Sequence, residues 1–553
     1  SLFLGFVYNR YFMDLAQAKK IGFFSALSIS LGSVIGVGIF LKNNSVIGAL
    51  TEGDNFSFWG LITSWIIAAI ISLFAAYSFS QISTSKQSKS GLAGWVDVLG
   101  GRKQGLFVKF THSSVYYSIL VSCLPIISLE GLFYAIDGAV NGGTTIHFGW
   151  IFLGGFVVFI SITALNYLAL KLSSRLQLIG TITKLVPLLL AIVVSLIGAN
   201  SSHVINNPNN IVDTTNPNNL VNSANGLNIN AIPSTNFFQI TGVFSALPGI
   251  LFSFDSFLTI GNLATDMKKP EKRVPIIAIL TIVIAAIVYI LISIGAGLTG
   301  MGSVGTILQT LFPKGTEFET ARKAIDITIN VFISLSAIFV ANALSMGSLK
   351  SCEGLIIAEE IMFYKQFKKL NLKKDNLGSL SLYLIQNLFY MFIFGIPAIA
   401  MNNDAIFDSA TNAPTLVFFL VYAYTMVLGV KDRYTKKICK NQLFGFTFAA
   451  VLSSFLILVV FCYTFFYNFM YEVSINGYSK SSSGLFYSKS NDIDGQVWLK
   501  SYDAILFWLI FLWIIILPTI NYFVLKKQTP KDSHNADLFL KKTGTKNWFK
   551  PIK

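Results

Sequence analysis

Long apolar runs constrain this chain more than any other feature of its sequence. A helix needs about 20 mostly apolar residues to cross the hydrocarbon core of a bilayer. The runs are continuous, whereas the strands of a membrane β-barrel alternate. Charged residues make up 12% of the chain, about half the share of a soluble protein. We therefore predict an all-α membrane protein with twelve transmembrane helices, at residues 21–41, 57–82, 107–131, 148–170, 176–198, 236–263, 274–298, 324–347, 380–401, 414–430, 443–470 and 503–525.

Basic residues alternate between the segments that connect these runs. Lys and Arg gather before the first run and after each even-numbered run, whereas residues 200–236 and 402–413 contain neither. Basic loops stay on the cytoplasmic side of a membrane. The pattern predicts a multi-pass protein of the cell membrane with both termini in the cytoplasm. It also accounts for the net charge of +15 without a nucleic-acid partner.

Two runs carry residues that interrupt a helix. The first contains "GSVIGVGIF" at 32–40, and each glycine inside a helix costs roughly 1 kcal/mol relative to alanine. The sixth contains Pro248, Gly249 and Asp255, and a carboxylate in the middle of a membrane is costly and points to function. Interruptions five runs apart are typical of transporters built from two inverted repeats of five helices.

An unwound segment frees backbone groups that must find partners in the membrane. A bound zwitterion can supply them, because its carboxylate fits the N-terminus of a half-helix and its ammonium fits a C-terminus. The organisation that we expect is a cytoplasmic lead-in at 1–20, a first repeat at 21–198, an outer Asn-rich loop at 199–235, a second repeat at 236–430, two peripheral helices at 431–525 with an outer loop at 471–502, and a basic tail at 526–553.

The interrupted runs carry a family resemblance. "GSVIGVGIF" resembles the first-span motif G-x-x-I-G-x-G-I-F of the amino acid–polyamine–organocation (APC) superfamily, and "LFSFDSFLTIGNLATDMKKPEKRVP" resembles the sixth span of its permeases and exchangers. The resemblance extends over residues 21 to about 300. It implies the leucine-transporter (LeuT-type) fold with a 5+5 inverted repeat and broken helices 1 and 6. Ser256, Phe257 and Asp266 depart from the family's Gly, Trp and Glu.

The resemblance also implies a substrate site. The N–H groups of Gly36, Val37 and Gly38 would take the carboxylate of an amino acid. The carbonyls of Val34, Phe252 and Asp255 would take its amino group, and Phe252 would gate the pocket. The candidate substrate site comprises Ser33, Val34, Gly36, Val37, Gly38, Phe252, Ser253, Asp255 and Ser256. Three roles stay open for Asp255: pairing with a cationic substrate, pairing internally, or capping the broken helix.

Lys184, in the fifth run, is the candidate coupling residue. Either it extends to the membrane interface, or, as the resemblance implies, it reaches the site that holds sodium in sodium-coupled members, as a lysine does at the matching position of proton-coupled relatives. Tyr116, Ser334 and Ser336 are weaker candidates for the substrate pathway, since such residues in membrane helices more often serve packing.

These features together predict a secondary transporter that moves amino acids by alternating access, with proton coupling or exchange. No nucleotide-binding loop, catalytic constellation or metal-ligand cluster stands out in the sequence. We therefore expect neither an enzyme nor a cofactor. An amino-acid sensor and a transporter of polyamines or other organocations are the alternatives. Oligomeric state stays open.

Overall fold

The described part of the chain folds almost entirely into helices. The computed structural model describes residues 21–36, 38–39, 43–52, 55–84, 90–141, 146–198, 238–299, 304–309, 311–312, 316–373, 376–402, 405–435, 438–439, 443–476 and 497–528. Within these residues eleven helices are long and apolar enough to cross a membrane, which confirms the all-α, multi-pass class. In the first predicted span, 21–41, the structure describes the shorter helix Phe23–Val34, so the count of twelve stays a prediction.

The first half of the chain supplies the elements up to the long outer segment. In chain order they are α2 (Phe23–Val34), α3 (Asn43–Ala49), β1 (Thr51–Glu52), β2 (Asn55–Phe56), α4 (Phe58–Ile82), α5 (Gly91–Gly100), α6 (Arg102–Thr111), the π-helical turn η2 (His112–Tyr117), α7 (Ser118–Asn141), α8 (Phe148–Leu168) and α9 (Leu170–Gly198). The short hairpin β1–β2 is antiparallel and was not predicted.

The second half begins with the other interrupted span. Its elements are α11 (Ile240–Phe254), the 3₁₀ turns η3 (Phe257–Gly261) and η4 (Ala264–Asp266), α12 (Pro270–Thr299), α13 (Val304–Gln309), η5 (Thr316–Phe318), α14 (Glu319–Ile357), α15 (Tyr364–Lys373), α16 (Leu377–Met401), α17 (Ala405–Tyr434), α18 (Phe446–Cys462), the π-helical segment η6 (Tyr463–Glu472), α19 (Val473–Asn476) and α20 (Val497–Gln528). The predicted lead-in 1–20 and loop 199–235 lie outside the described residues.

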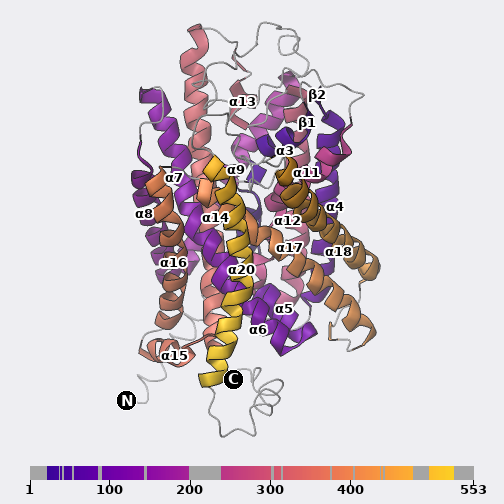
Figure 1. Ribbon diagram of the computed structural model, residues 1–553, viewed down its shortest axis with the longest axis vertical. Coiled ribbons are helices and arrows are strands. Elements are labelled where there is room, and N and C mark those ends of the chain that lie inside the picture. Colours follow the sequence, from indigo (N-terminus) through magenta and orange to yellow (C-terminus); the bar gives the residue numbers. More distant parts are fainter. Residues whose placement is uncertain are drawn as a thin grey trace.

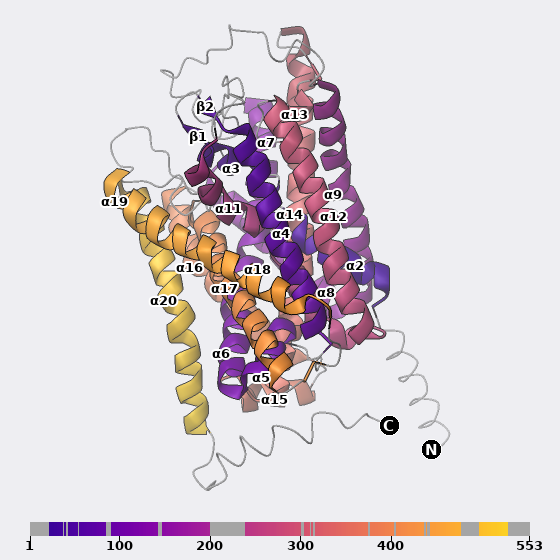
Figure 2. The same cartoon turned by 90° about the vertical axis from the view of Figure 1, so that its right-hand side faces the viewer.

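The helices pack as two groups around the interrupted segments. One group joins α2, α4, α11 and α12, and the other joins α7, α8, α14 and α16. Helix α2 packs on α12 of its own group and on α14 of the other group, and it also packs on α9. Helix α20 packs on α6 and α17 and runs along the outside of the molecule (Figures 1 and 2). The interrupted segments therefore lie where the two groups meet.

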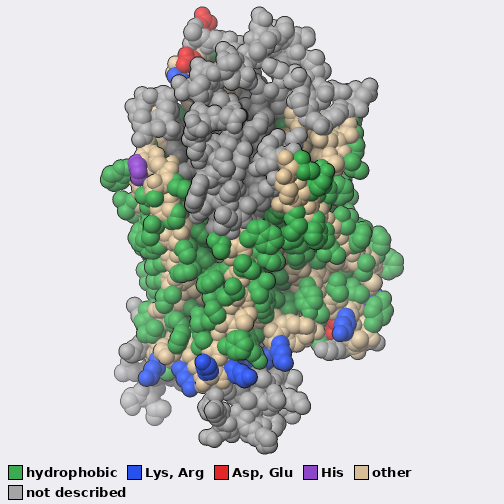
Figure 3. Space-filling model, in the orientation of Figure 1, with side chains coloured by type: hydrophobic (Ala, Val, Ile, Leu, Met, Phe, Trp, Pro, Cys, Tyr) green, Lys and Arg blue, Asp and Glu red, His purple; other side chains and the backbone are tan. Residues whose placement is uncertain are grey.

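On the visible face the helical body is largely apolar, and most of its basic side chains lie toward one end (Figure 3). In Figure 3 hydrophobic side chains cover the middle of the visible face, and Lys and Arg side chains follow its lower edge. Helices α5, α6, α15 and the last turns of α20 lie at this end, which we call the basic end (Figure 1). A broad apolar surface bounded by basic side chains is the pattern of a membrane-embedded protein.

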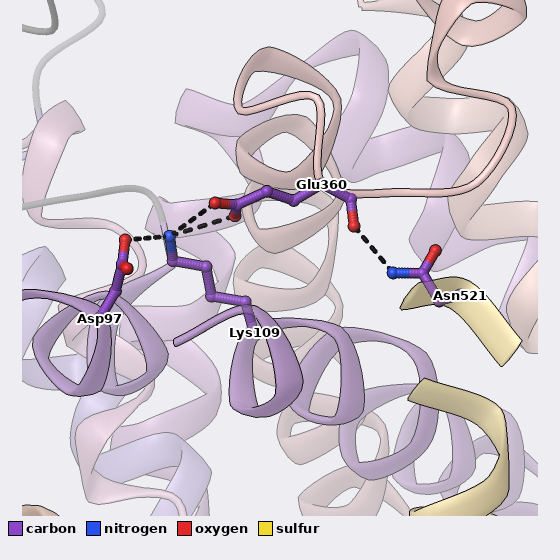
Figure 4. A network of polar contacts seen from close by, with 4 residues as sticks. All are labelled: Asp97, Lys109, Glu360 and Asn521. Carbon is purple, nitrogen blue, oxygen red and sulfur yellow. Dashed lines mark hydrogen bonds and ion pairs between the residues drawn. The ribbon is translucent and has the colours of Figure 1, made fainter. Parts of the chain in front are cut away.

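A buried ion network joins four elements at the basic end (Figure 4). The ammonium of Lys109 on α6 pairs with Asp97 on α5 and lies 3.1 Å from a carboxylate oxygen of Glu360, just beyond α14. Asn521 of α20 donates to the backbone carbonyl of Glu360 at 2.9 Å. The two carboxylates and the ammonium satisfy one another, as buried charges must.

Candidate functional site

The first predicted span is interrupted within its glycine motif. Helix α2 ends at Val34, and Ile35 is extended with φ −75° and ψ 95°. The last carbonyls of a helix lack partners within it and attract cations. Here the ammonium of Lys184, from α9, donates to the carbonyls of Gly32 at 2.7 Å and Ile35 at 2.9 Å. Lys184 is 1% exposed, so its side chain points to the break and not to the membrane interface.

The sixth predicted span breaks at Asp255. Helix α11 ends at Phe254, Asp255 is extended, and Ser256 has a left-handed backbone with φ 69°. That region favours glycine, the residue that the family resemblance places at the position of Ser256. The chain then continues as two 3₁₀ turns, so both predicted interruptions are present.

The carboxylate of Asp255 is bound inside the protein. Tyr116 of η2 donates to Oδ2 at 2.6 Å, and Tyr422 of α17 donates to Oδ1 at 2.7 Å. Each oxygen of the carboxylate therefore accepts a hydrogen bond from a tyrosine hydroxyl. Of the three roles left open for Asp255, the internal pairing is the one present in this structure.

The two broken segments are joined directly by hydroxyl groups. Ser33 of α2 donates to the carbonyl of Ser256 at 3.2 Å, and Ser30 donates to that of Phe257 at 3.3 Å. Tyr289 of α12 reaches both segments, because its hydroxyl lies 2.9 Å from the carbonyl of Val34 and 3.2 Å from that of Ser253. The carbonyls at the ends of both half-helices therefore converge on one point.

The three glycines of the first span each face a different helix. A Cβ atom on Gly32 would overlap the amide of Gln177 on α9, and one on Gly36 would overlap a methyl of Val340 on α14. One on Gly38 would lie 2.8 Å from the Cα atom of Ser253. The glycines thus allow the broken segment to lie against α9, α14 and α11 at once.

Most of the predicted site residues lie together at the two breaks. Phe252, in the last turn of α11, is half-buried, and its carbonyl accepts the N–H of Asp255 at 3.2 Å. Ser336 is buried on α14, one turn before Val340, and its hydroxyl has no hydrogen-bond partner among the described residues. Ser334 is also buried on α14. Val37 lies outside the described residues. Sequence reasoning missed two residues of the site, which are Tyr289 and Tyr422.

A family model and several known proteins match parts of this chain. A model of the family described as amino acid permease matches residues 21–489. The chain is 21% identical over 373 residues to an uncharacterized protein of Mycoplasma pneumoniae, covering 66% of this chain and 65% of that protein.

Two named Bacillus subtilis proteins are also similar. The branched-chain amino acid permease BcaP is 26% identical over 289 residues, which is 50% of this chain and 54% of BcaP. The serine/threonine exchanger SteT is 22% identical over 284 residues, which is 51% of this chain and 55% of SteT. The matched part therefore spans little more than half of each named relative.

Proposed function

The chain belongs to the amino acid permease family, and on that premise we propose that it is a secondary transporter which moves amino acids by alternating access. The observation that supports this most is the convergence of the Val34 and Ser253 carbonyls on the Tyr289 hydroxyl, at 2.9 and 3.2 Å. Each carbonyl has a second lone pair. An ammonium group at this point would accordingly find acceptors from both half-helices.

The glycine segment is the proposed partner for the substrate carboxylate. We assign to that carboxylate the N–H groups of Gly36, Val37 and Gly38, which follow the end of α2 in the sequence. Ser33, Ser253 and Ser256 belong to the same two broken segments and are proposed to line the substrate site. Phe252 is proposed to gate it. The proposed motion is a rocking of the group α2, α4, α11 and α12 against the group α7, α8, α14 and α16.

Lys184 is the proposed coupling residue. Its ammonium lies on two carbonyls of the broken first span and is buried. Loss of its proton would remove the cation from the end of α2 and weaken that contact. Proton coupling or plain exchange is thereby favoured over sodium coupling. In the proposed orientation the basic end and both termini face the cytoplasm, and the protein resides in the cell membrane.

Uptake into proteoliposomes tests the proposal. Labelled leucine, serine, glutamate, lysine and cadaverine are supplied at two pH values to vesicles with and without unlabelled substrate inside. We expect uptake of at least one amino acid that is accelerated by internal substrate. Binding without uptake for every compound would instead indicate a sensor.

A matched pair of variants compares the same substitution at two buried tyrosines, one at the breaks and one away from them. Tyr289→Phe removes the hydroxyl that joins the two half-helices, so we expect KM to rise at least tenfold. Tyr390→Phe removes a hydroxyl that accepts a bond from Trp513 at 2.9 Å, away from the breaks. We expect that variant to transport normally. Equal effects of the two substitutions would contradict the assignment of the site.

The role of Asp255 separates amino acids from organocations. Because the carboxylate is already bound by two tyrosine hydroxyls, we expect Asp255→Asn to reduce the rate for all substrates alike. A selective loss of lysine and cadaverine uptake would identify Asp255 as a cation-binding group and favour the organocation alternative.

A further inference from the structure

We propose that α15 and the last turn of α20 form a binding site for the headgroup of an anionic phospholipid. The argument starts from the hydrogen bonds that hold these two elements together. The side chain of Asn521 accepts the N–H of Met362 at 2.6 Å and donates to the carbonyl of Glu360 at 2.9 Å. Two turns further on, Gln528 accepts the N–H of Phe363 at 3.2 Å. The start of α15 is therefore fixed to the end of α20.

Each of the two joined elements carries a pair of basic residues. Lys365 and Lys369 lie one turn apart on the exposed side of α15, and Lys526 and Lys527 form the exposed last turn of α20. The neighbouring carboxylates are already engaged, since Glu359 pairs with Lys368 at 2.8 Å and Glu360 pairs with Lys109. Four ammonium groups thus remain to attract an anion.

Helix α15 has the two faces of a helix that lies in a membrane surface. Tyr364 and Phe367 pack inward against the core, whereas Lys365 and Lys369 face outward. Phe363, before the helix, is 50% exposed, and Leu372 in its last turn is 84% exposed. A helix with Lys on its polar face and exposed apolar residues beside them sits at the boundary of headgroups and acyl chains.

The surface of α20 identifies the ligand as a lipid and not a small anion. Ile516, Ile520 and Phe523 are 45, 43 and 57% exposed and lead along the helix to the two lysines. An apolar strip that ends in ammonium groups fits an acyl chain that ends in a phosphate. Lys and Arg side chains follow the lower edge of the apolar surface at this end of the molecule (Figure 3).

Native mass spectrometry tests the site on the full-length protein. The protein is titrated with phosphatidylglycerol or phosphatidylcholine, and the bound lipid is counted. Each lysine near a membrane surface contributes about fivefold to the binding of an anionic lipid. We therefore expect Lys365→Gln with Lys369→Gln, or Lys526→Gln with Lys527→Gln, to weaken phosphatidylglycerol binding about thirtyfold and to leave phosphatidylcholine binding unchanged.

Two controls keep the test specific. Lys272→Gln removes an exposed lysine in the first turn of α12, and we expect it to have no effect on the site. Lys365→Arg with Lys369→Arg keeps the charge, so binding should persist, which separates lost charge from a misfolded helix. Equal loss with Lys272→Gln would overturn the proposal. So would competition by inorganic phosphate at equal affinity, because the site would then be one for a free anion.

Discussion

Each glycine of the segment 32–40 packs against a different neighbouring helix. From the sequence, these residues suggest a backbone left open for a ligand. The structure adds that side chains from three helices occupy the places where Cβ atoms would stand. Close packing of helices and an unwound backbone both require glycine. The sequence pattern alone therefore does not show which of the two explains these residues.

A substitution at Gly36 distinguishes packing from ligand access. Gly36→Ala places a Cβ atom against a methyl of Val340, and overpacking of this kind costs about 1–3 kcal/mol. We expect the variant to be less stable in a thermal unfolding assay. Val340→Ala removes the clashing methyl, so the double variant should recover stability. If stability returns but uptake does not, Gly36 also serves the substrate. A single variant as stable as the parent would contradict the close approach.

We expect Lys184 to contribute both to the stability of the protein and to the pH dependence of uptake. Lys184→Met leaves the carbonyls of Gly32 and Ile35 without their donor, and a buried polar group left unpaired costs about 1–3 kcal/mol. We expect lower stability and, in vesicles, uptake that no longer depends on pH. Lys184→Arg keeps the cation and should retain stability but not the proton exchange. Uptake by Lys184→Met with the parental pH dependence would exclude Lys184 as the proton carrier.

At the scale of elements, the interruptions could be predicted and their partners could not. The glycine motif at 32–40 and the carboxylate of Asp255 identify where α2 and α11 end, because glycine weakens a helix and a carboxylate is costly in a membrane. Pro248 lies inside α11 and does not mark the break. Tyr289 lies in the apolar stretch "AAIVYIL", where its hydroxyl gives no sign of its target. Tyr422 and Tyr424 look alike in sequence, yet Tyr422 binds Asp255 and Tyr424 is 39% exposed. Contacts between distant parts of the chain decide these roles.

The ion network at the basic end gives a prediction for the stability of four elements together. Burial raises the pKa of the Glu360 carboxyl, and the nearby Lys109 ammonium opposes that shift. Lys109→Met leaves the carboxylate buried without its cation, which costs about 3–5 kcal/mol.

The same variant should respond to pH. Without Lys109, Glu360 has to bind a proton to stay buried, so its pKa in the folded protein lies above that in the unfolded chain. Stability is then retained at low pH and lost as the pH rises through the folded pKa. We expect Lys109→Met to unfold at lower temperature at pH 8 than at pH 5, and Glu360→Gln in the same chain to remove that difference. An equal loss at both pH values would contradict the network.

At the scale of the whole molecule, Asp266 links three spans at the basic end. The backbone carbonyl of Asp266, after the broken sixth span, accepts the N–H of Ile21 at 2.8 Å. Its carboxylate pairs with Lys350 of α14 at 3.0 Å. This ion pair crosses from one helix group to the other, so an opening at the basic end would have to break it.

Cys352, which is buried on α14 two residues from Lys350, reports on that opening. In a chain with the other three cysteines replaced by serine, Asp266→Asn should raise the rate of maleimide labelling. Because the pair is partly exposed and contributes at most about 1 kcal/mol, we expect roughly a fivefold change. Asp266→Lys with Lys350→Asp should restore the slow rate.

The control for this experiment is Glu319→Gln. It removes an ion pair with Lys323 that lies within a single helix at the opposite end of α14. We expect labelling of Cys352 to stay slow in that variant. Fast labelling in both variants would mean that the charge of α14, and not the contact between the two groups, controls access.

The π-helical turn η2 sets the angular relation between two halves of one transmembrane helix. Before it, Lys109 faces Asp97 and Glu360, and within it Tyr116 faces Asp255. Successive residues of an α-helix are about 100° apart around its axis, and a π-helical turn holds one residue more than an α-helical turn. Loss of a single residue from 112–117 would rotate one half against the other by about that angle, so no continuous α-helix of the same sequence can serve both partners.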